Sequence, residues 1–206
     1  MRKNKLARIN LSQDILSSVE PYNVKDGWSS KDAPVMTFKK LIKSELIRNQ
    51  SGRCAYCDLP LETRNPEIDH IAPKGGSKRP KHVECTFLPL NLVYACHNCN
   101  STNCKGSTDV VIKKHGEYKD WEFSIVHPYL DDPIDYFHVN ENDEICILPK
   151  RDADEYHKKK AKKTISIFNL NSEGKLNEMA KQIESEQHSD NIRRIIEEIT
   201  CYSPSQ

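Results

Sequence analysis

Two Cys-x-x-Cys pairs enclose the part of this chain whose residue types could do chemistry. The pairs are Cys54 with Cys57 and Cys96 with Cys99, and the run Glu67-Ile68-Asp69-His70 lies between them. Four thiolates at this spacing are typical of a closed tetrahedral zinc site, which has no open position for a substrate. A redox pair or a chance pattern is the alternative. The sequence therefore predicts a structural zinc, with any catalytic metal held elsewhere.

The Asp-His pair has the groups that phosphodiester hydrolysis needs. A neutral imidazole, with an ordinary pKa of about 6.5, can take a proton from water, and His70 is placed to do so. The carboxylate of Asp69 is a hard oxygen ligand of the kind that Mg²⁺ or Mn²⁺ prefers. Neighbours on an extended segment point to opposite faces, so the two side chains can serve different partners. A solvated surface pair is the alternative, and the position between the zinc pairs argues against it.

Two asparagines lie close to the second cysteine pair. Asn100 directly follows Cys99, so a zinc would fix its position, and its amide oxygen could complete a cation site with Asp69. Asn91 begins an expected strand, where its amide could tie down the loop backbone and orient His70. Isolated asparagines otherwise mark turns.

Taken in order, these motifs resemble those of the HNH endonuclease family, which has the ββα-metal fold. The matching set is Cys54-x-x-Cys57, Asp69-His70-Ile71-x-Pro73, Gly75-Gly76, Asn91-Leu92 and Cys96-x-x-Cys99-Asn100, within about 50 of the 206 residues. The resemblance implies a zinc-stabilised nuclease core with this fold. Together with the hydrophobic patterns around it, it predicts an α+β protein with an N-terminal arm and helix and a helical C-terminal extension. It also implies that His70 is the general base, that Asp69 and Asn100 hold catalytic Mg²⁺ or Mn²⁺, and that Asn91 supports them.

Two positions depart from the family pattern. Many members have histidine where Asn100 stands, so the chain resembles the asparagine variant. The lysine that often follows four residues after the second cysteine is Asn103 here, with Lys105 two residues later. A role for Lys105 in contacting phosphate therefore cannot be assigned from the sequence.

The flanks are similar to a narrower group, the HNH subunit of Septu-type anti-phage systems, including retron-associated ones. The similarity lies in the helix before Cys54, the segment from His127 to Pro133, and the C-terminal helices. It implies the nuclease effector of a bacterial defence complex that an ATPase partner controls. We interpret His127 as a structural histidine before a proline turn.

Hydrophobic periodicity divides the chain into four regions. Residues 1–36 are an arm with many breakers, whose apolar residues Ile9 to Leu16 predict a packed arm or a docking element. Residues 37–107 are the nuclease core, with a helix over 36–50, strands around Asp69 and over Leu92–Ala95, and a helix from Cys96. Residues 108–150 are rich in strand signals and 151–206 are helical. A stripe of isoleucines from Ile192 to Ile199 could pack on the core or bind a regulator.

Charge is divided unevenly along the chain, although the net charge is only +1. Residues 1–107 hold 17 Lys and Arg against 10 Asp and Glu, and the remainder holds 14 against 20. Phosphate binding depends on local charge, so the basic half with the motif favours DNA as a partner. The candidate contacts are in one basic loop, at Lys74, Lys78, Arg79 and Lys81. A lysine run at 158–163 reads as a solvated helix face.

The remaining features of the sequence indicate the compartment in which the protein is expected. No stretch of about 18 apolar residues predicts a membrane span. No signal peptide is expected, so the eight cysteines are interpreted as reduced thiols in the cytoplasm. Cys104, five residues after Cys99, is a possible substitute ligand. The sequence predicts a metal-dependent endonuclease, and a non-catalytic zinc-dependent module that binds nucleic acid or protein is the alternative.

Overall fold

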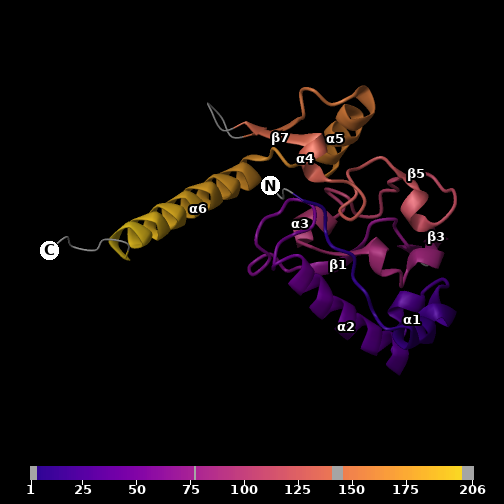
Figure 1. Ribbon diagram of the computed structural model, residues 1–206. Coiled ribbons are helices and arrows are strands. Elements are labelled where there is room, and N and C mark those ends of the chain that lie inside the picture. Colours follow the sequence, from indigo (N-terminus) through magenta and orange to yellow (C-terminus); the bar gives the residue numbers. More distant parts are fainter. Residues whose placement is uncertain (1–3, 77, 141–145, 201–206) are drawn as a thin grey trace.

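The computed structural model describes residues 4–76, 78–140 and 146–200, without the side chains of residues 80, 186, 193 and 195–200. It has a mixed α+β fold (Figure 1). The helices are α1 (Gln13–Val19), α2 (Ala33–Asn49), α3 (His97–Asn100), α4 (Pro133–Tyr136), α5 (Glu155–Ile167) and α6 (Glu173–Thr200). The strands are β1 (Glu67–His70), β2 (Gly75–Gly76), β3 (Arg79–Pro80), β4 (Leu92–Ala95), β5 (Val111–Lys113), β6 (Glu122–Phe123), β7 (Phe137–Asn140) and β8 (Cys146–Pro149).

The centre of the molecule is the antiparallel pair β1 and β4, in a register that sets Asp69 opposite Val93 and His70 opposite Leu92. The single-turn helix α3 follows β4 directly. The sequence predicted strand, loop, strand and helix in this order, and the structure confirms that order. All four residues of β4 are buried.

Helix α2 packs under this pair through one buried stripe: Val35, Phe38, Ile42 and Leu46. It starts three residues earlier than predicted, because Pro34 fits the first turn of a helix, where no N–H is needed. Its end is tied to β4 by the buried Gln50 side chain, which donates to the carbonyl of Tyr94 and accepts from its N–H. The helix therefore delivers the chain to Cys54 in a fixed position.

The N-terminal arm is more regular than predicted, since it contains α1. Ile9, Leu11, Ile15 and Leu16 are partly buried against the core, which makes this segment a packed arm. The N–H of Leu6 also donates to the carbonyl of Pro128, 2.8 Å away, so the arm reaches the C-terminal half.

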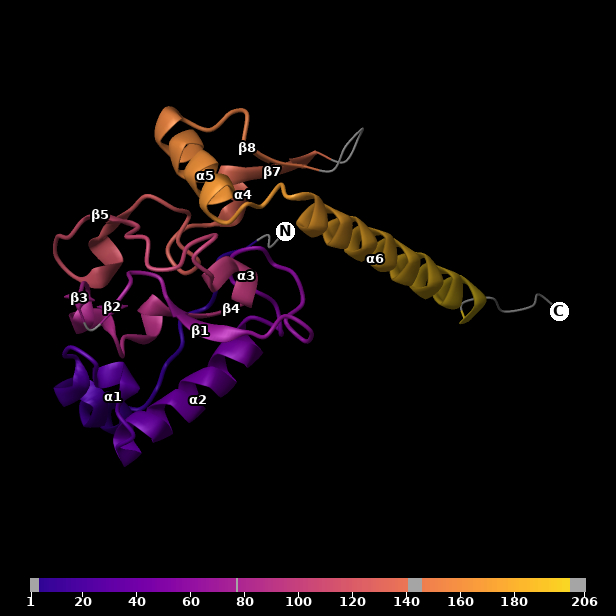
Figure 2. The same cartoon turned by 180° about the vertical axis from the view of Figure 1, so that it is seen from behind.

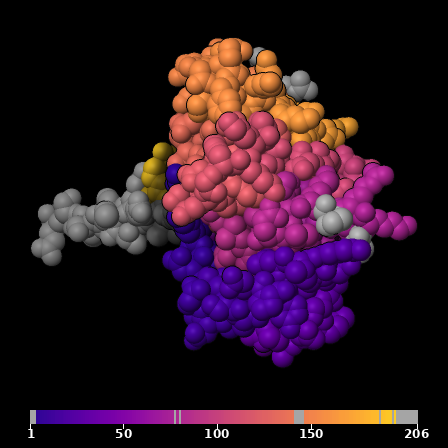
Figure 3. Space-filling model, turned by 90° about the vertical axis from the view of Figure 1, so that its right-hand side faces the viewer, coloured from indigo at the N-terminus to yellow at the C-terminus, as the bar shows by residue number. Residues whose placement is uncertain are grey.

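The part of the C-terminal half from β5 to α5 lies on the opposite side of the motif segment from α1 and α2 (Figures 1 and 3). Its described strands form the antiparallel pairs β5–β6 and β7–β8. The lysine run on α5 is not wholly solvated as predicted. Lys160 is 7% exposed and lies 2.6 Å from the carboxylate of Asp131, because this turn of α5 faces the segment after His127.

Helix α6 begins on the motif segment and then projects away from the rest of the molecule (Figures 1 and 2). Lys175 and Met179, in its first turns, are buried. Every described side chain from Glu184 to Ile192 is exposed. The part of the predicted isoleucine stripe from residue 195 onward lies outside the described side chains. None of the described helices has the length and apolarity to cross a membrane.

Candidate functional site

The four predicted zinc ligands lie together and are all buried. The sulfur atoms of Cys54, Cys57, Cys96 and Cys99 are within 4.8 Å of one another, with 3.8 Å between those of Cys57 and Cys96. Thiolates bound about 2.3 Å from a tetrahedral centre lie about 3.8 Å apart, so this cluster has the size of a closed zinc site. Cys104 is half-buried and is not part of the cluster. The donor set therefore fits a structural zinc.

The surroundings of the cluster suit negatively charged sulfur. The backbone N–H of Cys96 lies 3.4 Å from the sulfur of Cys54, and the ammonium of Lys175 lies 3.4 Å from the sulfur of Cys99. Hydrogen bonds and a cation beside a metal-bound thiolate offset its charge. Because Lys175 comes from α6, the first turn of the last helix is part of this centre.

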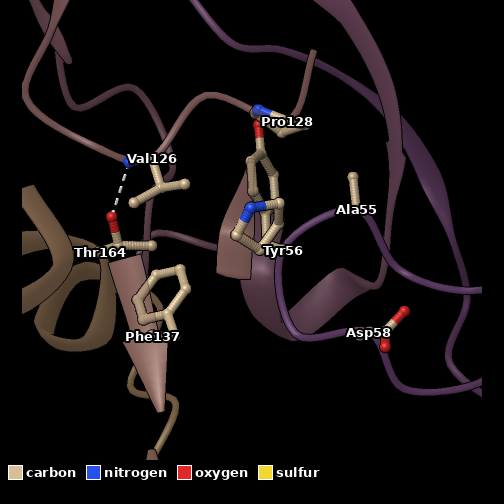
Figure 4. Close-up of a pocket in the computed structure, with 8 residues that line it drawn as sticks. Ala55, Tyr56, Asp58, Val126, Pro128, Phe137 and Thr164 are labelled. Atoms are coloured by element: carbon tan, nitrogen blue, oxygen red, sulfur yellow. Dashed lines mark hydrogen bonds between the residues drawn. The ribbon is translucent and has the colours of Figure 1, made fainter. Parts of the chain in front are cut away.

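The two residues between the first pair of cysteines, Ala55 and Tyr56, lie beside the C-terminal half (Figure 4). Between Cys54 and Cys57, Tyr56 stacks on Phe168 with ring centroids 4.0 Å apart. A cavity of about 30 Å³ lies beside it, bounded on its other side by Val126, Phe137 and Thr164. Such a volume holds a water molecule or two rather than a nucleotide. This contact is structural.

Asp69 is held on the cluster side of β1. Its carboxylate accepts from the ammonium of Lys105 at 3.0 Å and from the hydroxyl of Tyr56 at 2.5 Å. Lys105 also donates to the carbonyl of His70, 2.7 Å away, and is only 1% exposed. Burial and the charge of Asp69 raise the pKa of Tyr56 well above its ordinary value, so this hydroxyl stays protonated and donates. Lys105 is therefore an internal partner of Asp69.

His70 points to the opposite side of the strand. Its Nε2 lies 3.1 Å from the carbonyl oxygen of Thr86, and its ring meets the ring of Trp28 edge-on, with centroids 4.7 Å apart. A carbonyl only accepts, so Nε2 carries the hydrogen and Nδ1 keeps its lone pair. Burial lowers the pKa of His70 to about 3, assisted by the charges of Lys74, Lys105 and Lys39. The imidazole is therefore neutral at pH 7.

Asn91 clamps the loop that follows His70. Its side chain is fully buried, accepts from the N–H of Ala72 at 2.7 Å, and donates to the carbonyls of Ala72 and Cys85. The hydroxyl of Tyr118 also donates to it, and Tyr118 is in turn 3.2 Å from Nε2 of His127. His127 is completely buried in this chain of hydrogen bonds, in agreement with the structural interpretation.

Asn100 reaches back to β1. Its Nδ2 donates to the carboxylate of Glu67, 2.8 Å away, which leaves Oδ1 as an acceptor. Glu67 lies two residues before Asp69, so both carboxylates belong to one face of the strand. Carboxylate and amide oxygens are the hard donors that Mg²⁺ and Mn²⁺ take, so Glu67 and Asn100 have suitable donor types, whereas both oxygens of Asp69 already accept from Lys105 and Tyr56. Within the described residues, the cysteine cluster alone gathers three or more His, Cys, Asp or Glu side chains closely enough to share an ion.

Three of the four predicted basic-loop residues are exposed. They are Lys78 and Arg79 on the β2–β3 hairpin and Lys81, whose ammonium donates to the carbonyl of Ser107. Their role in nucleic-acid binding stays a prediction. Lys74 is half-buried beside Trp28 and lies close enough to His70 to lower its pKa. Of these four residues, Lys74 is therefore the one nearest to the histidine.

Several residues at the site were not singled out from the sequence. Glu67 could have been found, since it is two residues from Asp69 on a strand. Tyr56 stands inside the first cysteine pair, but nothing in that spacing indicates a bond to Asp69. Trp28 and Thr86 reach His70 from loops 42 residues before it and 16 residues after it, and no local pattern marks them.

Replacing Lys105 by methionine is expected to destabilise the protein by about 3–5 kcal/mol, because it leaves a buried carboxylate without its cation. Urea unfolding of the zinc-loaded protein measures this loss. The double variant with Lys105→Met and Asp69→Asn should lose less stability than the sum of the losses of the two single variants, because it buries no charge. Lys158→Met, which removes the ion pair between a half-buried lysine and the exposed Glu155, is the control and should cost at most about 1 kcal/mol. Equal small losses in both lysine variants would contradict the buried pair.

Comparison with known proteins gives partial matches. No protein-family model matches the chain. A segment of 72 residues, 35% of the chain, is 36% identical to the CRISPR-associated endonuclease Cas9 of Corynebacterium diphtheriae. This match and the cysteine cluster fit an HNH-type nuclease. A segment of 125 residues, 61% of the chain, is 26% identical to protein ea31 of Escherichia phage lambda. The matches span only 6% and 34% of those two proteins.

Proposed function

We propose that this chain is a metal-dependent HNH endonuclease that hydrolyses phosphodiester bonds of DNA, with β1, β4 and α3 forming its ββα-metal motif. The observation that carries the proposal is the anchoring of His70. A neutral imidazole, fixed at Nε2 by the carbonyl of Thr86, stands next to Asp69 on a strand pair that the cysteine cluster braces. The partial likeness to an endonuclease supports the same reading.

In this proposal His70 is the general base. Nδ1 accepts a proton from the attacking water, while Asn91 holds the loop that follows His70 and so keeps the ring in place. Asp69 and Asn100 are the proposed cation ligands, and Glu67 orients the amide of Asn100 through its hydrogen bond. A cation at Asp69 would have to displace the ammonium of Lys105 or the hydroxyl of Tyr56 from its carboxylate. A bound Mg²⁺ or Mn²⁺ would stabilise the charge that develops on the leaving oxygen.

The low pKa of His70 has a consequence for substrate binding. A base with a pKa of about 3 accepts a proton only weakly in the free protein. After burial, the groups that lower this pKa are Lys74, Lys105 and Lys39. A phosphate placed against Lys74 or Lys39 would neutralise part of that positive charge. Substrate binding would then raise the pKa of the imidazole towards the range in which it is an effective base.

We also propose that the nuclease is the effector of a bacterial anti-phage defence complex and that an ATPase partner gates it. An ATPase is proposed as the partner because of the resemblance of the flanks to the Septu-type HNH subunit. The support from the fold is α6, whose described side chains from Glu184 to Ile192 are exposed all around the helix. Most helices in proteins owe their stability to tertiary packing of one face, so a projecting helix of this kind suits a partner's surface.

Plasmid nicking tests the proposal. The zinc-loaded protein is expected to relax supercoiled DNA with added Mg²⁺ or Mn²⁺, and to leave it intact in buffer without either cation. Equal cleavage without added cation would contradict a metal-dependent reaction.

Two further outcomes separate the alternatives. Cleavage that appears only after an ATPase partner is added would favour the gated effector. DNA binding that needs no cation, with no cleavage under any condition, would favour the non-catalytic zinc-dependent binding module.

A further inference from the structure

A groove of about 590 Å³ runs between α2 and the edge of the β1–β4 pair. We call it the α2 groove. Its apolar floor and ends are formed by Trp28, Met36, Pro66, Ile68 and Tyr94. On the side of the helix it is lined by Lys39, Lys40 and Lys43. Its volume is in the range of about 300–1,000 Å³ that is usual for ligand sites. None of these residues belongs to the basic loop that the sequence indicated.

The three lysines of the α2 groove are held without acidic partners. In the described part of the chain, none of them has a carboxylate oxygen within ion-pair distance. Instead, the ammonium of Lys39 lies 4.9 Å from the centre of the Trp28 ring, and that of Lys43 lies 5.7 Å from the centre of the Tyr94 ring. Burial lowers the pKa of Lys39, and so do the charges of Lys31 and Lys74. An anion in the groove would relieve this repulsion.

The α2 groove lies one side chain away from the proposed general base. Trp28 lines the groove and also touches His70, and Glu67 closes the groove beside Asn100. The position of Trp28 is fixed by the turn before it. A Cβ on Gly27 would lie 1.8 Å from the carbonyl oxygen of Tyr22, so only glycine permits this close approach.

We propose that the α2 groove binds an unpaired nucleic-acid strand and guides it to His70. The inference rests on the proposed nuclease function and adds the form of the substrate. Lys40 and Lys43 contact successive phosphates, and the bases lie on the apolar floor formed by Met36, Ile68 and Trp28.

The chemistry of the groove favours an unpaired strand over a duplex. Bases in a duplex are stacked inside it and present only their edges, whereas a single strand exposes base faces that an apolar floor can cover. Cationic walls with aromatic and apolar floors are the usual design of sites that follow a single strand. Three lysines along α2 without paired carboxylates argue for phosphate rather than for a neutral protein surface, and the one carboxylate of the groove, Glu67, accepts from Asn100 instead.

Fluorescence anisotropy with a labelled oligothymidylate of about 12 nucleotides tests the inference, with zinc-loaded protein in buffer without added Mg²⁺. The variant is Lys40→Glu with Lys43→Glu, both exposed, so the fold should tolerate the change. The matched control is Lys162→Glu with Lys163→Glu, two exposed lysines on α5 with the same change of charge. The groove variant is expected to bind at least about 10-fold more weakly than the control. The slope of the logarithm of its binding constant against the logarithm of the salt concentration should become less steep by about 1.4. This is the value for two lost phosphate contacts to a single strand.

The outcomes separate this inference from the proposed function. Equal affinity of the groove variant and the control would overturn the inference even if the wild type cuts plasmid. Tighter binding of a duplex of the same length than of the single strand would overturn the unpaired strand as its occupant. Selective loss of single-strand binding would support the groove even if no condition gave cleavage, in which case only the proposed catalysis would fail.

Discussion

His70→Ala is expected to lower the single-turnover rate of plasmid nicking by about 10²–10⁴-fold, the usual contribution of a general base. The neutral ring is oriented by the hydrogen bond from Nε2 to Thr86, and alanine supplies neither that orientation nor a proton acceptor. The rate should be measured with Mg²⁺ and with Mn²⁺ at matched zinc content. Cleavage by a pure His70→Ala preparation at the wild-type rate would show that another group takes the proton.

A second histidine provides the matched control. His82 is 8% exposed, against 5% for His70, and its Nε2 lies 3.0 Å from the carboxylate of Asp109. His82→Ala therefore removes a similarly buried ring and a hydrogen bond without touching the proposed base. It should melt at a lower temperature than the wild type and yet nick plasmid at a similar rate when folded. A comparable loss of rate in both variants would mean that reduced stability explains the effect of His70→Ala.

Local sequence patterns predicted the framework of the site because short-range physics determines it. Cysteines three positions apart place two thiols at one turn, so the ligand set of the cluster could be assigned before its geometry was known. Alternation along a strand separated the environments of Asp69 and His70, and the structure agrees, with Lys105 on one side and Trp28 on the other. The side-chain roles of the proposed base and cation ligands stay predictions.

The partners of these side chains could not be predicted, since they come from distant parts of the chain. Lys105 lies 36 residues after Asp69 and becomes buried because the chain folds back over the cluster. The sequence could weigh this lysine only as a doubtful phosphate contact. In the same way, Lys160 was predicted to be solvated, because the sequence does not indicate its contact with Asp131. Lysines are buried only where a specific acceptor meets them, and periodicity carries no information about that acceptor.

Removing the zinc is expected to unfold the motif segment. The cluster joins the end of α2, the end of β4 and the start of α6, through Cys54, Cys96 and the contact of Lys175 with Cys99. Structural zinc contributes about 10–16 kcal/mol in small zinc-binding peptides, as much as the whole stability of an ordinary domain. Cys99→Ser should therefore purify without zinc and show loss of secondary structure by circular dichroism.

The matched control for this change is Cys104→Ser, five residues along the chain. Cys104 is a half-buried thiol outside the cluster, so the variant should keep one zinc per chain and the wild-type spectrum. The comparison also tests the alternative ligand that the sequence left open. If Cys104→Ser lost zinc while Cys99→Ser kept it, Cys104 would be the fourth ligand. The turn from α3 to Lys105 would then have to be rearranged, and the bond that holds Asp69 would be rearranged with it.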